Sequence, residues 1–342
     1  MTDITLPAEW EPQSGIQLTW PHADTDWNYM LDEVTACYIS IAQAISQRER
    51  LLIVCKNAAE VTQQLSGVNS RNITLCEIST NDTWARDHGG ISIRQADGKL
   101  EVCDFCFNGW GLKFAANLDN QITRRMYGHH LFAPDVAYRN CLNFVLEGGS
   151  IESDGQGTIL TTVECLLSAN RNEQFSQDEI ETRLHQFFGT KRVLWLHHGA
   201  LQGDDTDSHV DTLARFCDAN TIAYVQCRDT NDPHYGELKA MEDELKTFRT
   251  ASGKPYRLLA LPMADKVVID EERLPATYAN FLIMNNAVLV PTYGTSHDED
   301  ALNILSQAFP ERKIIGINCV PLIRQHGSLH CITMQYPAGV IK

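Results

Sequence analysis

Residues 280–293, NFLIMNNAVLVPTY, place two short apolar runs on either side of Asn285-Asn286. An asparagine pair tolerates the left-handed backbone that a tight turn requires, so this stretch predicts a β-hairpin. Successive stretches of this kind have turns roughly 55 to 65 residues apart, which predicts a repeated structural module. The other three predicted turns are Asp97-Gly98, Asp154-Gly155 and Ala219-Asn220.

Each hairpin is expected to lead into a helix and then into a further strand. Ser176 and Glu179 form a capping box ahead of the amphipathic segment at 180–188, and residues 235–249 show the same helical period. A similar helical segment is predicted at 29–47. The strands predicted after these helices are RLLIVC at 50–55, RVLWL at 192–196 and RLLALP at 257–262.

The two ends of the chain also contain strand-like stretches, GIQLTW at 15–20 and HCITMQYP at 330–337. Pairing of these stretches would complete a fifth module and close the modules into a ring, with loops from every module around one axis. The predicted fold class is therefore α/β, built from five ββαβ-type modules. No linker, low-complexity tract or long charge block interrupts the chain, so residues 1–342 are predicted to form a single domain.

The composition limits the classes of function. The chain has 28 Lys and Arg against 44 Asp and Glu, a net charge of −16, which argues against a nucleic-acid partner and slightly favours a cationic substrate. No apolar run could span a bilayer, and the start MTDITLPAEW lacks a secretion-signal pattern, so we expect a cytoplasmic protein without a membrane partner. The 11 cysteines, mostly within apolar runs, predict reduced thiols.

The sequence lacks the signatures of P-loop nucleotide-dependent enzymes, serine hydrolases and zinc proteases. Cys103 and Cys106 form a single CxxC without the second pair that a structural zinc site needs, and we expect them on a core strand. His197 and His198 are adjacent, so on a strand they point to opposite faces and do not easily share an ion. We therefore expect neither a metal nor an organic cofactor.

Polar residues gather instead in four motifs within otherwise apolar surroundings. Glycine pairs in two of the motifs allow close approach of the backbone. Taken singly, each motif has a structural explanation, such as a turn, a cap or a core cysteine. The motifs are NDTWARDHGG with Asp82, Trp84, Arg86 and Asp87; LEGGSI with Glu147; DDTDSHVD with Asp204, Asp205, Asp207, His209 and Asp211; and HGSLHCITMQ with His330 and Cys331.

Together, the four motifs supply the groups for one kind of chemistry. A cysteine thiolate is a nucleophile, and a histidine can donate and accept protons beside it. One carboxylate suffices to orient the histidine, and further buried carboxylates would be costly without a cation to neutralise them. Guanidinium is a flat cation that pairs with carboxylates two hydrogen bonds at a time. The motifs therefore predict a pocket that binds a guanidinium and attacks its central carbon.

The motifs and their order, from LPAEWEPQSGIQLTWPH to HCITMQYP, resemble the guanidine-modifying (pentein) superfamily, and within it the agmatine deiminases and bacterial-type peptidylarginine deiminases. The resemblance covers nearly the whole chain and implies a five-bladed α/β propeller. It also implies that Cys331 is the nucleophile and His209 the general acid and base. Asp87 and Asp211 would grip the guanidinium, and Glu147 would lie beside both the guanidinium and the histidine.

Further residues are implied to contact the substrate. Trp84 would wall the substrate channel, and Trp110 lies in FCFNGWGLKF, a candidate lid. Asp204 and Asp205 suit an ammonium at the far end of the substrate. The chain departs from the family at Glu152, where the family usually has His after GGSI. It also has NDTWARDHGG where the family usually has NDxWMRDxGP, and QHGSLHC in place of GGGNIHC.

The predicted activity is hydrolysis of agmatine to N-carbamoylputrescine and ammonia through a covalent intermediate on Cys331. Three alternatives stay open. The first is a deiminase of another guanidino compound, including free arginine or a peptide C-terminal arginine; the second is an amidinotransferase; the third is a non-catalytic binding module. The expected partner is a small cationic guanidino compound, and a homodimer is expected because related enzymes often associate.

Overall fold

The computed structural model describes residues 4–342, and its sheets repeat one strand order. In each three-stranded sheet an antiparallel hairpin comes first, and the third strand lies parallel to the second. All four predicted turns are confirmed. These sheets are β4 (Ile91–Arg94), β5 (Leu100–Cys106) and β6 (Ala137–Val145); β7 (Ile151–Ser153), β8 (Thr158–Thr162) and β9 (Arg192–Leu196); β10 (Ala214–Asp218), β11 (Thr221–Gln226) and β12 (Arg257–Pro262); and β15 (Leu282–Met284), β16 (Ala287–Thr292) and β17 (Lys313–Asn318).

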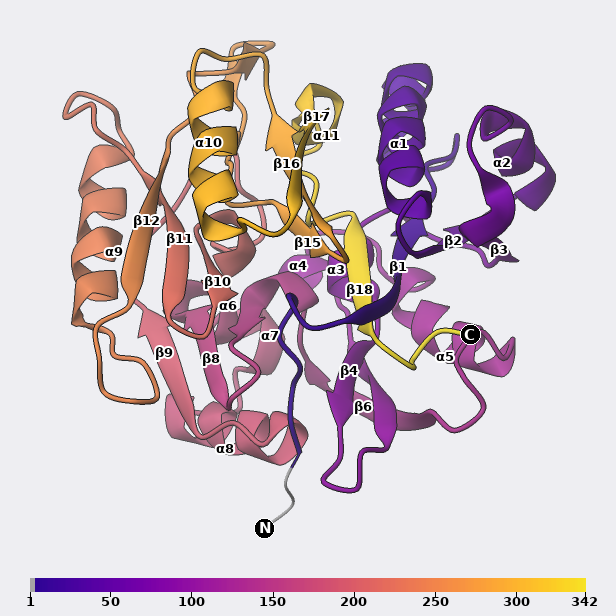
Figure 1. The fold of residues 1–342 in the computed structure, drawn as a ribbon, viewed down its shortest axis with the longest axis horizontal. Helices are drawn as coiled ribbons and strands as arrows, with labels where there is room; N and C mark the ends of the chain where they lie inside the picture. The colour runs from indigo at the N-terminus through magenta and orange to yellow at the C-terminus, as the bar shows by residue number, and fades with distance from the viewer. Residues whose placement is uncertain (1–3) are drawn as a thin grey trace.

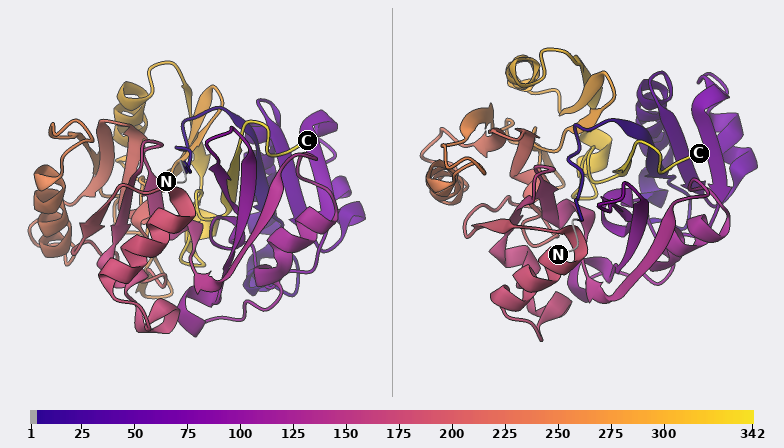
Figure 2. Two further views of the ribbon diagram at one scale, coloured as in Figure 1. Left: turned by 90° about the horizontal axis from the view of Figure 1, so that it is seen from below. Right: turned by 60° about the horizontal axis from the view of Figure 1, so that its bottom comes forward.

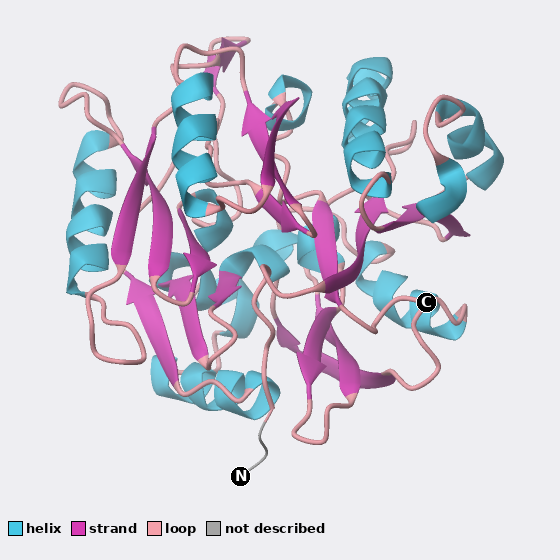
Figure 3. Ribbon diagram, viewed as in Figure 1, coloured by secondary structure: helices cyan, strands magenta, loops and turns pink. Residues whose placement is uncertain are grey.

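A helix makes the crossover that each parallel pair requires. In α8 (Gln177–Phe188), the side chain of Ser176 accepts from the backbone N–H of Glu179, whose carboxylate accepts from the backbone N–H of Ser176, so the predicted capping box is confirmed. These helices lie at the outside of the molecule, with the strands further in (Figure 3). The other crossover helices are α5 (Ile122–Gly128), α9 (Tyr235–Thr247) and α10 (Asp298–Ala308).

The two ends of the chain complete a fifth sheet. β18 (Thr333–Pro337) pairs antiparallel with β1 (Gln13–Thr19), and β1 lies parallel to β2 (Arg50–Cys55) after the crossover through α1 (Leu31–Ser46). Figure 1 shows the last strand, in yellow, beside the first, in indigo. The predicted pairing of the ends and the mixed α/β fold are therefore confirmed. The sequence did not predict the fourth strand of this sheet, β3 (Ile73–Glu77).

Short helical segments lie toward the middle of the molecule, in contrast to the long outer helices (Figures 1 and 2). Three of them, α3, η4 and η5, each stand just before a hairpin and contact one another through η4. The remaining elements are α2 (Ala58–Gln64), α3 (Ala85–His88), α4 (Gly109–Leu112), α6 (Val163–Leu166), α7 (Ala169–Asn172), α11 (Val320–Ile323), the ribbon of β13 (Val268–Ile269) and β14 (Glu272–Arg273), and the 3-10 helices η1 (Asp26–Met30), η2 (Ser70–Asn72), η3 (Asp119–Gln121), η4 (Gly148–Ser150) and η5 (Val210–Thr212).

Apolar side chains fill the space between the outer helices and the sheets. On α1, for example, Val34, Tyr38, Ile41 and Ile45 are fully buried at helical spacing. All 11 cysteines are free thiols, and all except the half-buried Cys106 are buried, which confirms the prediction of reduced core cysteines. Within residues 4–342, none of the helices has the length and apolar character that a membrane crossing requires.

Candidate active site

Five short segments meet at the centre of the molecule, and each lies directly before the first strand of an antiparallel pair. Asp87 precedes β4, Gly149 precedes β7, Asp211 precedes β10, Asn280 precedes β15 and Cys331 precedes β18. Their side chains or backbones contact one another in the centre. The repeated module therefore brings five equivalent positions of the chain to one place.

The thiol of Cys331 is almost completely buried among polar groups. Its Sγ lies 3.4 Å from Asn280 Oδ1 and 3.9 Å from Asp211 Oδ2. Burial raises the pKa of the thiol well above its usual value, and the charges on Asp211 and Asp87 raise it further. The thiol is therefore protonated in the empty site, and a cation placed near the two carboxyl groups would favour the thiolate.

The pKa values of the two central carboxyl groups, Asp211 and Asp87, are shifted in opposite directions. Burial acts to raise the pKa of Asp211, but the pKa is lowered overall because His330 Nδ1 lies 2.7 Å from Oδ2 and pairs with it. For Asp87, burial and the charge of Asp211 raise the pKa well above its usual value. Trp110 Nε1 and the backbone N–H of Gly149 donate to Asp87 at 2.9 and 3.0 Å and offset only part of that increase. The empty site thus favours one charged and one neutral carboxyl group.

The ring of His209 and the carboxyl groups of Asp87 and Asp211 all lie close to the backbone of Gly149. A Cβ at Gly149 would lie 2.7 Å from His209 Nδ1, 2.8 Å from Asp87 Oδ1 and 3.2 Å from Asp211 Oδ2, so only glycine leaves room there. Neither ring nitrogen of His209 has a hydrogen-bond partner, and Nδ1 is 3.6 Å from Asp87 Oδ1. Burial lowers the pKa of His209 to about 3, so the ring is neutral and can accept a proton.

Glu147 is buried and paired with a cation from the same chain. Both its carboxylate oxygens accept from Arg171 Nε, at 3.0 and 3.1 Å. Arg171 also donates to Asp207 Oδ2 at 2.6 Å and to the carbonyl of Thr206 at 2.8 Å. Glu147 therefore anchors the loop that carries His209, and a carboxylate oxygen of Glu147 comes within 4.8 Å of a ring nitrogen of His209.

A pocket with a volume of about 170 Å³ opens beside Cys331. Trp84 and Trp110 line it with their rings 6.3 Å apart and nearly perpendicular, and Trp84 packs so closely on Gly327 that a Cβ there would lie 2.1 Å from the ring. Four aspartates line the pocket, and no Lys or Arg of residues 4–342 does. The other lining residues are Asp26, Asp82, Asp87, Phe114, Asp205, Thr206, Gln325 and His326.

The adjacent aspartates Asp204 and Asp205 have different surroundings. Asp205 lines the pocket, as the sequence predicts for a residue near the substrate. Asp204 is not among the residues that line the pocket. Its carboxylate points into its own loop, where it accepts from the backbone N–H groups of Thr206 and Ser208 and from the hydroxyl of Thr206. In this structure the carboxylate of Asp204 stabilises the conformation of its loop, and its role in substrate binding stays a prediction.

Several site residues escaped the sequence analysis. Asn280 accepts from the backbone N–H groups of His330 and Cys331, and the repeat itself could have pointed to it, because it occupies the position before a hairpin. Arg171 approaches Glu147 from α7, and no local pattern marks that contact. The sequence does mark Glu152 as a departure from the family, but it does not reveal the partner of Glu152, the buried Arg215, with which it forms an ion pair.

Two buried groups bring three potential metal-binding atoms within 4.8 Å of one another. In one group Arg171 already pairs with Glu147, and in the other Arg215 pairs with Glu9 and Glu152, so these carboxylates are already neutralised. Neither group fits a resident cation as it stands. The groups are Glu147, Cys165 and His209, and Glu9, Glu152 and His330.

Comparison with known proteins places this site in a family. The family model of the Porphyromonas-type peptidyl-arginine deiminases matches residues 5–337. The chain belongs to this family. An agmatine deiminase from Ectopseudomonas mendocina is 33% identical over 97% of this chain and 95% of its own length. Related proteins are named as deiminases, enzymes that hydrolyse C–N bonds of amidines, and this chain is a hydrolase of that class.

Solved structures agree with the family assignment. The structure of C. jejuni agmatine deiminase with substrate bound is 38% identical, with a TM-score of 0.92, and covers 99% of this chain and 97% of that one. A Porphyromonas gingivalis protein, provisionally named an arginine deiminase, is 54% identical with a TM-score of 0.96, covering 99% of this chain and all of that one. The names of these two relatives specify different guanidino substrates.

The charge of Asp211 is expected to suppress the reactivity of the Cys331 thiol. Asp211→Asn should speed alkylation of Cys331 by iodoacetamide at pH 7 by at least about tenfold, since each unit of thiol pKa changes the thiolate fraction tenfold. Asp87→Asn should act less, because Asp87 favours its neutral form in the empty site. Peptide mass spectrometry over time measures both rates, and an equal or slower rate in Asp211→Asn would contradict the argument.

Gly149 is expected to tolerate no side chain. Gly149→Ala should lower kcat/KM by at least about a hundredfold, because the new methyl would displace His209 and Asp87 from their shared position. Gly128→Ala is the matched control, since a Cβ there has nothing within 4 Å. Steady-state kinetics and thermal unfolding of both variants separate a displaced site from a lost fold. Full activity in folded Gly149→Ala would refute the geometry.

Proposed function

We propose that this protein is an agmatine deiminase, which hydrolyses agmatine to N-carbamoylputrescine and ammonia. The acidic lining of the pocket beside Cys331 is the observation that carries the proposal. Agmatine has a guanidinium at one end and an ammonium at the other. Asp87 and Asp211 suit the guanidinium, and Asp82 and Asp205 lie where an ammonium needs negative charge.

In the proposed first half-reaction, the thiol of Cys331 gives its proton to His209 as the guanidinium binds. The thiolate forms a bond to the guanidinium carbon. His209 then passes the proton to one terminal nitrogen, the bond from carbon to that nitrogen breaks, and ammonia leaves. An amidino-thioether on Cys331 remains, and Asp87 and Asp211 stabilise its positive charge.

In the proposed second half-reaction, the neutral ring of His209 takes a proton from water, and the hydroxide attacks the amidino carbon. Collapse of the resulting adduct breaks the bond from carbon to sulfur and restores the thiolate of Cys331, which recovers its proton from His209. The product loses its hydroxyl proton to solvent, where the ammonia released in the first half-reaction becomes ammonium. The balance is one guanidinium and one water in, and one urea group and one ammonium out.

The second candidate is a deiminase of arginine, free or at the C-terminus of a peptide. The family name and the provisional name of the P. gingivalis relative favour it. An arginine substrate brings a carboxylate to the far end of the pocket, where Asp26, Asp82 and Asp205 would repel it. Agmatine lacks that carboxylate, and we therefore prefer it. An amidinotransferase would pass the amidino group to an added amine and release the alkylamine of the donor, so it would form no ammonia.

We further infer that the five sheets are the blades of an α/β propeller and that residues 1–342 form a single catalytic domain. Support comes from the common strand order of five sheets and from the pairing of the two chain ends. A homodimer in the cytoplasm, without nucleic-acid or membrane partners, is also part of the proposal, and it rests on the sequence alone.

Ammonia release from a panel of guanidines tests the proposed substrate. We expect release from agmatine at least about a hundredfold faster, in kcat/KM, than from free arginine or a peptide with C-terminal arginine, because the carboxylate of either is repelled. Faster release from an arginine compound would transfer the function to the second candidate. No ammonia, but conversion of an added amine to a new guanidine, would indicate an amidinotransferase.

The same measurement of ammonia release tests whether Cys331 is the nucleophile. Cys331→Ala should abolish release, with a loss of at least about 10⁴-fold. Cys106→Ala should retain activity, since Cys106 is half-buried on β5 and does not line the pocket. Residual turnover in folded Cys331→Ala at more than about a hundredth of the wild-type rate would exclude Cys331 as the nucleophile.

The acidic lining also predicts how agmatine affinity changes with pH. Burial and the charge of Asp26 raise the pKa of Asp82 to about 7, and burial and the charge of Asp204 raise that of Asp205 to about 6. Both carboxyl groups lose their protons as pH rises through these values, so the KM for agmatine should fall from about pH 5.5 to about pH 8.

Butylguanidine, which lacks the ammonium, is the control substrate and should show a smaller fall in KM over this range. Asp82→Asn should remove the upper part of the fall for agmatine and leave butylguanidine nearly unchanged. Steady-state kinetics with both substrates measures the difference. Parallel KM profiles for the two substrates in the wild type would contradict a role for these carboxylates in binding the ammonium.

A further inference from the structure

His330 lies between two buried carboxylates, one of which belongs to the candidate active site. Its Nδ1 is 2.7 Å from Asp211 Oδ2, and its Nε2 is 2.7 Å from Glu9 Oε2. The ring is 1% exposed, and Glu9 is 8% exposed. His330 therefore connects the centre of the site to the N-terminal segment, which is more than 300 residues away along the chain.

A charged carboxylate can only accept, so the contact with Asp211 requires a proton on Nδ1. At Nε2 the ring faces both Glu9 Oε2, an acceptor, and the guanidinium of Arg215 at 3.0 Å, a donor. Burial opposes charge on Glu9, but His330 and Arg215 together lower the pKa of Glu9 well below its usual value. His330 likewise outweighs burial at Asp211, whose pKa is lowered. Both carboxyl groups are therefore charged, and the Nδ1–H of the ring donates to Asp211.

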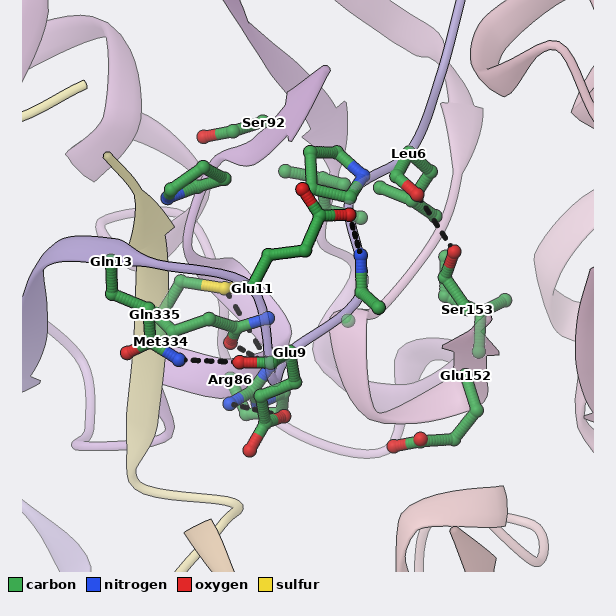
Figure 4. Close-up of a pocket in the computed structure, with 16 residues that line it drawn as sticks. Leu6, Glu9, Glu11, Gln13, Arg86, Ser92, Glu152, Ser153, Met334 and Gln335 are labelled. Atoms are coloured by element: carbon green, nitrogen blue, oxygen red, sulfur yellow. Dashed lines mark hydrogen bonds and ion pairs between the residues drawn. The ribbon is translucent and has the colours of Figure 1, made fainter. Parts of the chain in front are cut away.

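Glu9 is itself fixed in place by buried cations. Its Oε2 accepts from Arg215 at 2.9 Å and lies 3.8 Å from Arg86, and its Oε1 accepts from the backbone N–H of Ile283 at 2.7 Å. Figure 4 shows Glu9 beside Arg86 at a small pocket of about 60 Å³, separate from the one beside Cys331. Arg215 also pairs with Glu152, so the groups that contact His330 Nε2 are themselves held in place.

The same loop fixes His330 relative to the nucleophile. The backbone N–H groups of His330 and Cys331 both donate to Asn280 Oδ1, at 2.8 and 3.3 Å. Asn280 in turn donates to the carbonyl of Asp211 at 3.3 Å. A ring held at this point sets the direction of the Asp211 carboxylate, whose Oδ2 is 3.9 Å from Cys331 Sγ.

We propose that His330 is a positioning residue, which aims the Asp211 carboxylate at the guanidinium through its Nδ1–H and is itself held at Nε2 by Glu9 and Arg215. The inference deepens the proposed function, on which it rests for its substrate. His330 acts through Asp211 and does not line the pocket beside Cys331. The residue before the nucleophile thus links substrate binding to the ion pairs of Glu9 and Arg215.

Two substitutions separate the two hydrogen bonds of the ring. The amide nitrogen of Asn can occupy the place of Nδ1, and that of Gln can occupy the place of Nε2. In a Cys331→Ala background, which binds agmatine without turnover, calorimetry gives the dissociation constant directly. We expect His330→Asn to bind agmatine within about threefold of the parent, and His330→Gln and His330→Ala to bind at least about tenfold more weakly.

A purely structural role would make affinity follow thermal stability, irrespective of which nitrogen is replaced. His234→Asn is the matched control, because His234 is 4% exposed and its Nδ1 lies 2.7 Å from Asp232 outside the pocket; its affinity should stay within about twofold of the parent. The inference is overturned if His330→Asn and His330→Gln bind equally well, or if His330→Gln binds better.

The outcomes also separate this inference from the proposed function. If the parent binds another guanidine and not agmatine, the proposed substrate is wrong, and the same comparison of Asn with Gln is made with that guanidine. If the parent binds agmatine and the two variants do not differ, only the positioning role of His330 fails. If the parent binds no guanidine of the panel, both fail.

Discussion

The buried negative charge of Asp211 is the constraint on which the rest of this structure depends. A carboxylate with no exposed surface is costly unless a cation pairs with it, and no Lys or Arg side chain of the described residues pairs with Asp211 within 4.0 Å. His330 donates to Asp211 through its Nδ1–H, and beyond it Glu9 and Glu152 both pair with Arg215. The N-terminal segment is thereby tied to the last hairpin, and the charge can remain at the centre of an otherwise apolar interior.

The repeated module explains how residues so far apart in the sequence form one site. Each hairpin begins from a short segment near the centre, so the positions before β4, β7, β10, β15 and β18 become neighbours once the sheets have formed. The backbone repeats, but the side chains do not: one segment supplies a nucleophile, one an amide and two a carboxylate. The segment before β7 supplies a glycine, whose missing side chain makes room for the others. Equivalent positions of a repeated backbone thus carry different side chains, which together supply the groups of the proposed reaction.

Much of this framework could be predicted from the sequence because its signals are local. Turn pairs such as Asp97-Gly98 and the capping box at Ser176 act within a few residues, and the pairing of the chain ends followed from counting modules. The motifs also located Asp87, Asp211 and Cys331, which the structure brings together. Arg171 could not be predicted, because its role arises only when α7 packs beside Glu147. The sequence could not separate Asp204 from Asp205 either, because adjacent aspartates look alike in sequence and only the fold shows which carboxylate its own loop uses.

The site is short of positive charge, and under the proposed function this shortage would favour cationic substrates. Asp211 has its partner in His330, but Asp87 has only the neutral donors Trp110 and Gly149, and burial therefore favours its protonated form. Asp82 and Asp205 have raised pKa values for the same physical reason. A ligand with a cation at each end would supply the missing charge at both places, and the same charge would favour the thiolate of Cys331. The nucleophile would then become reactive mainly when a cationic ligand is in place, because binding and activation use one electrostatic interaction.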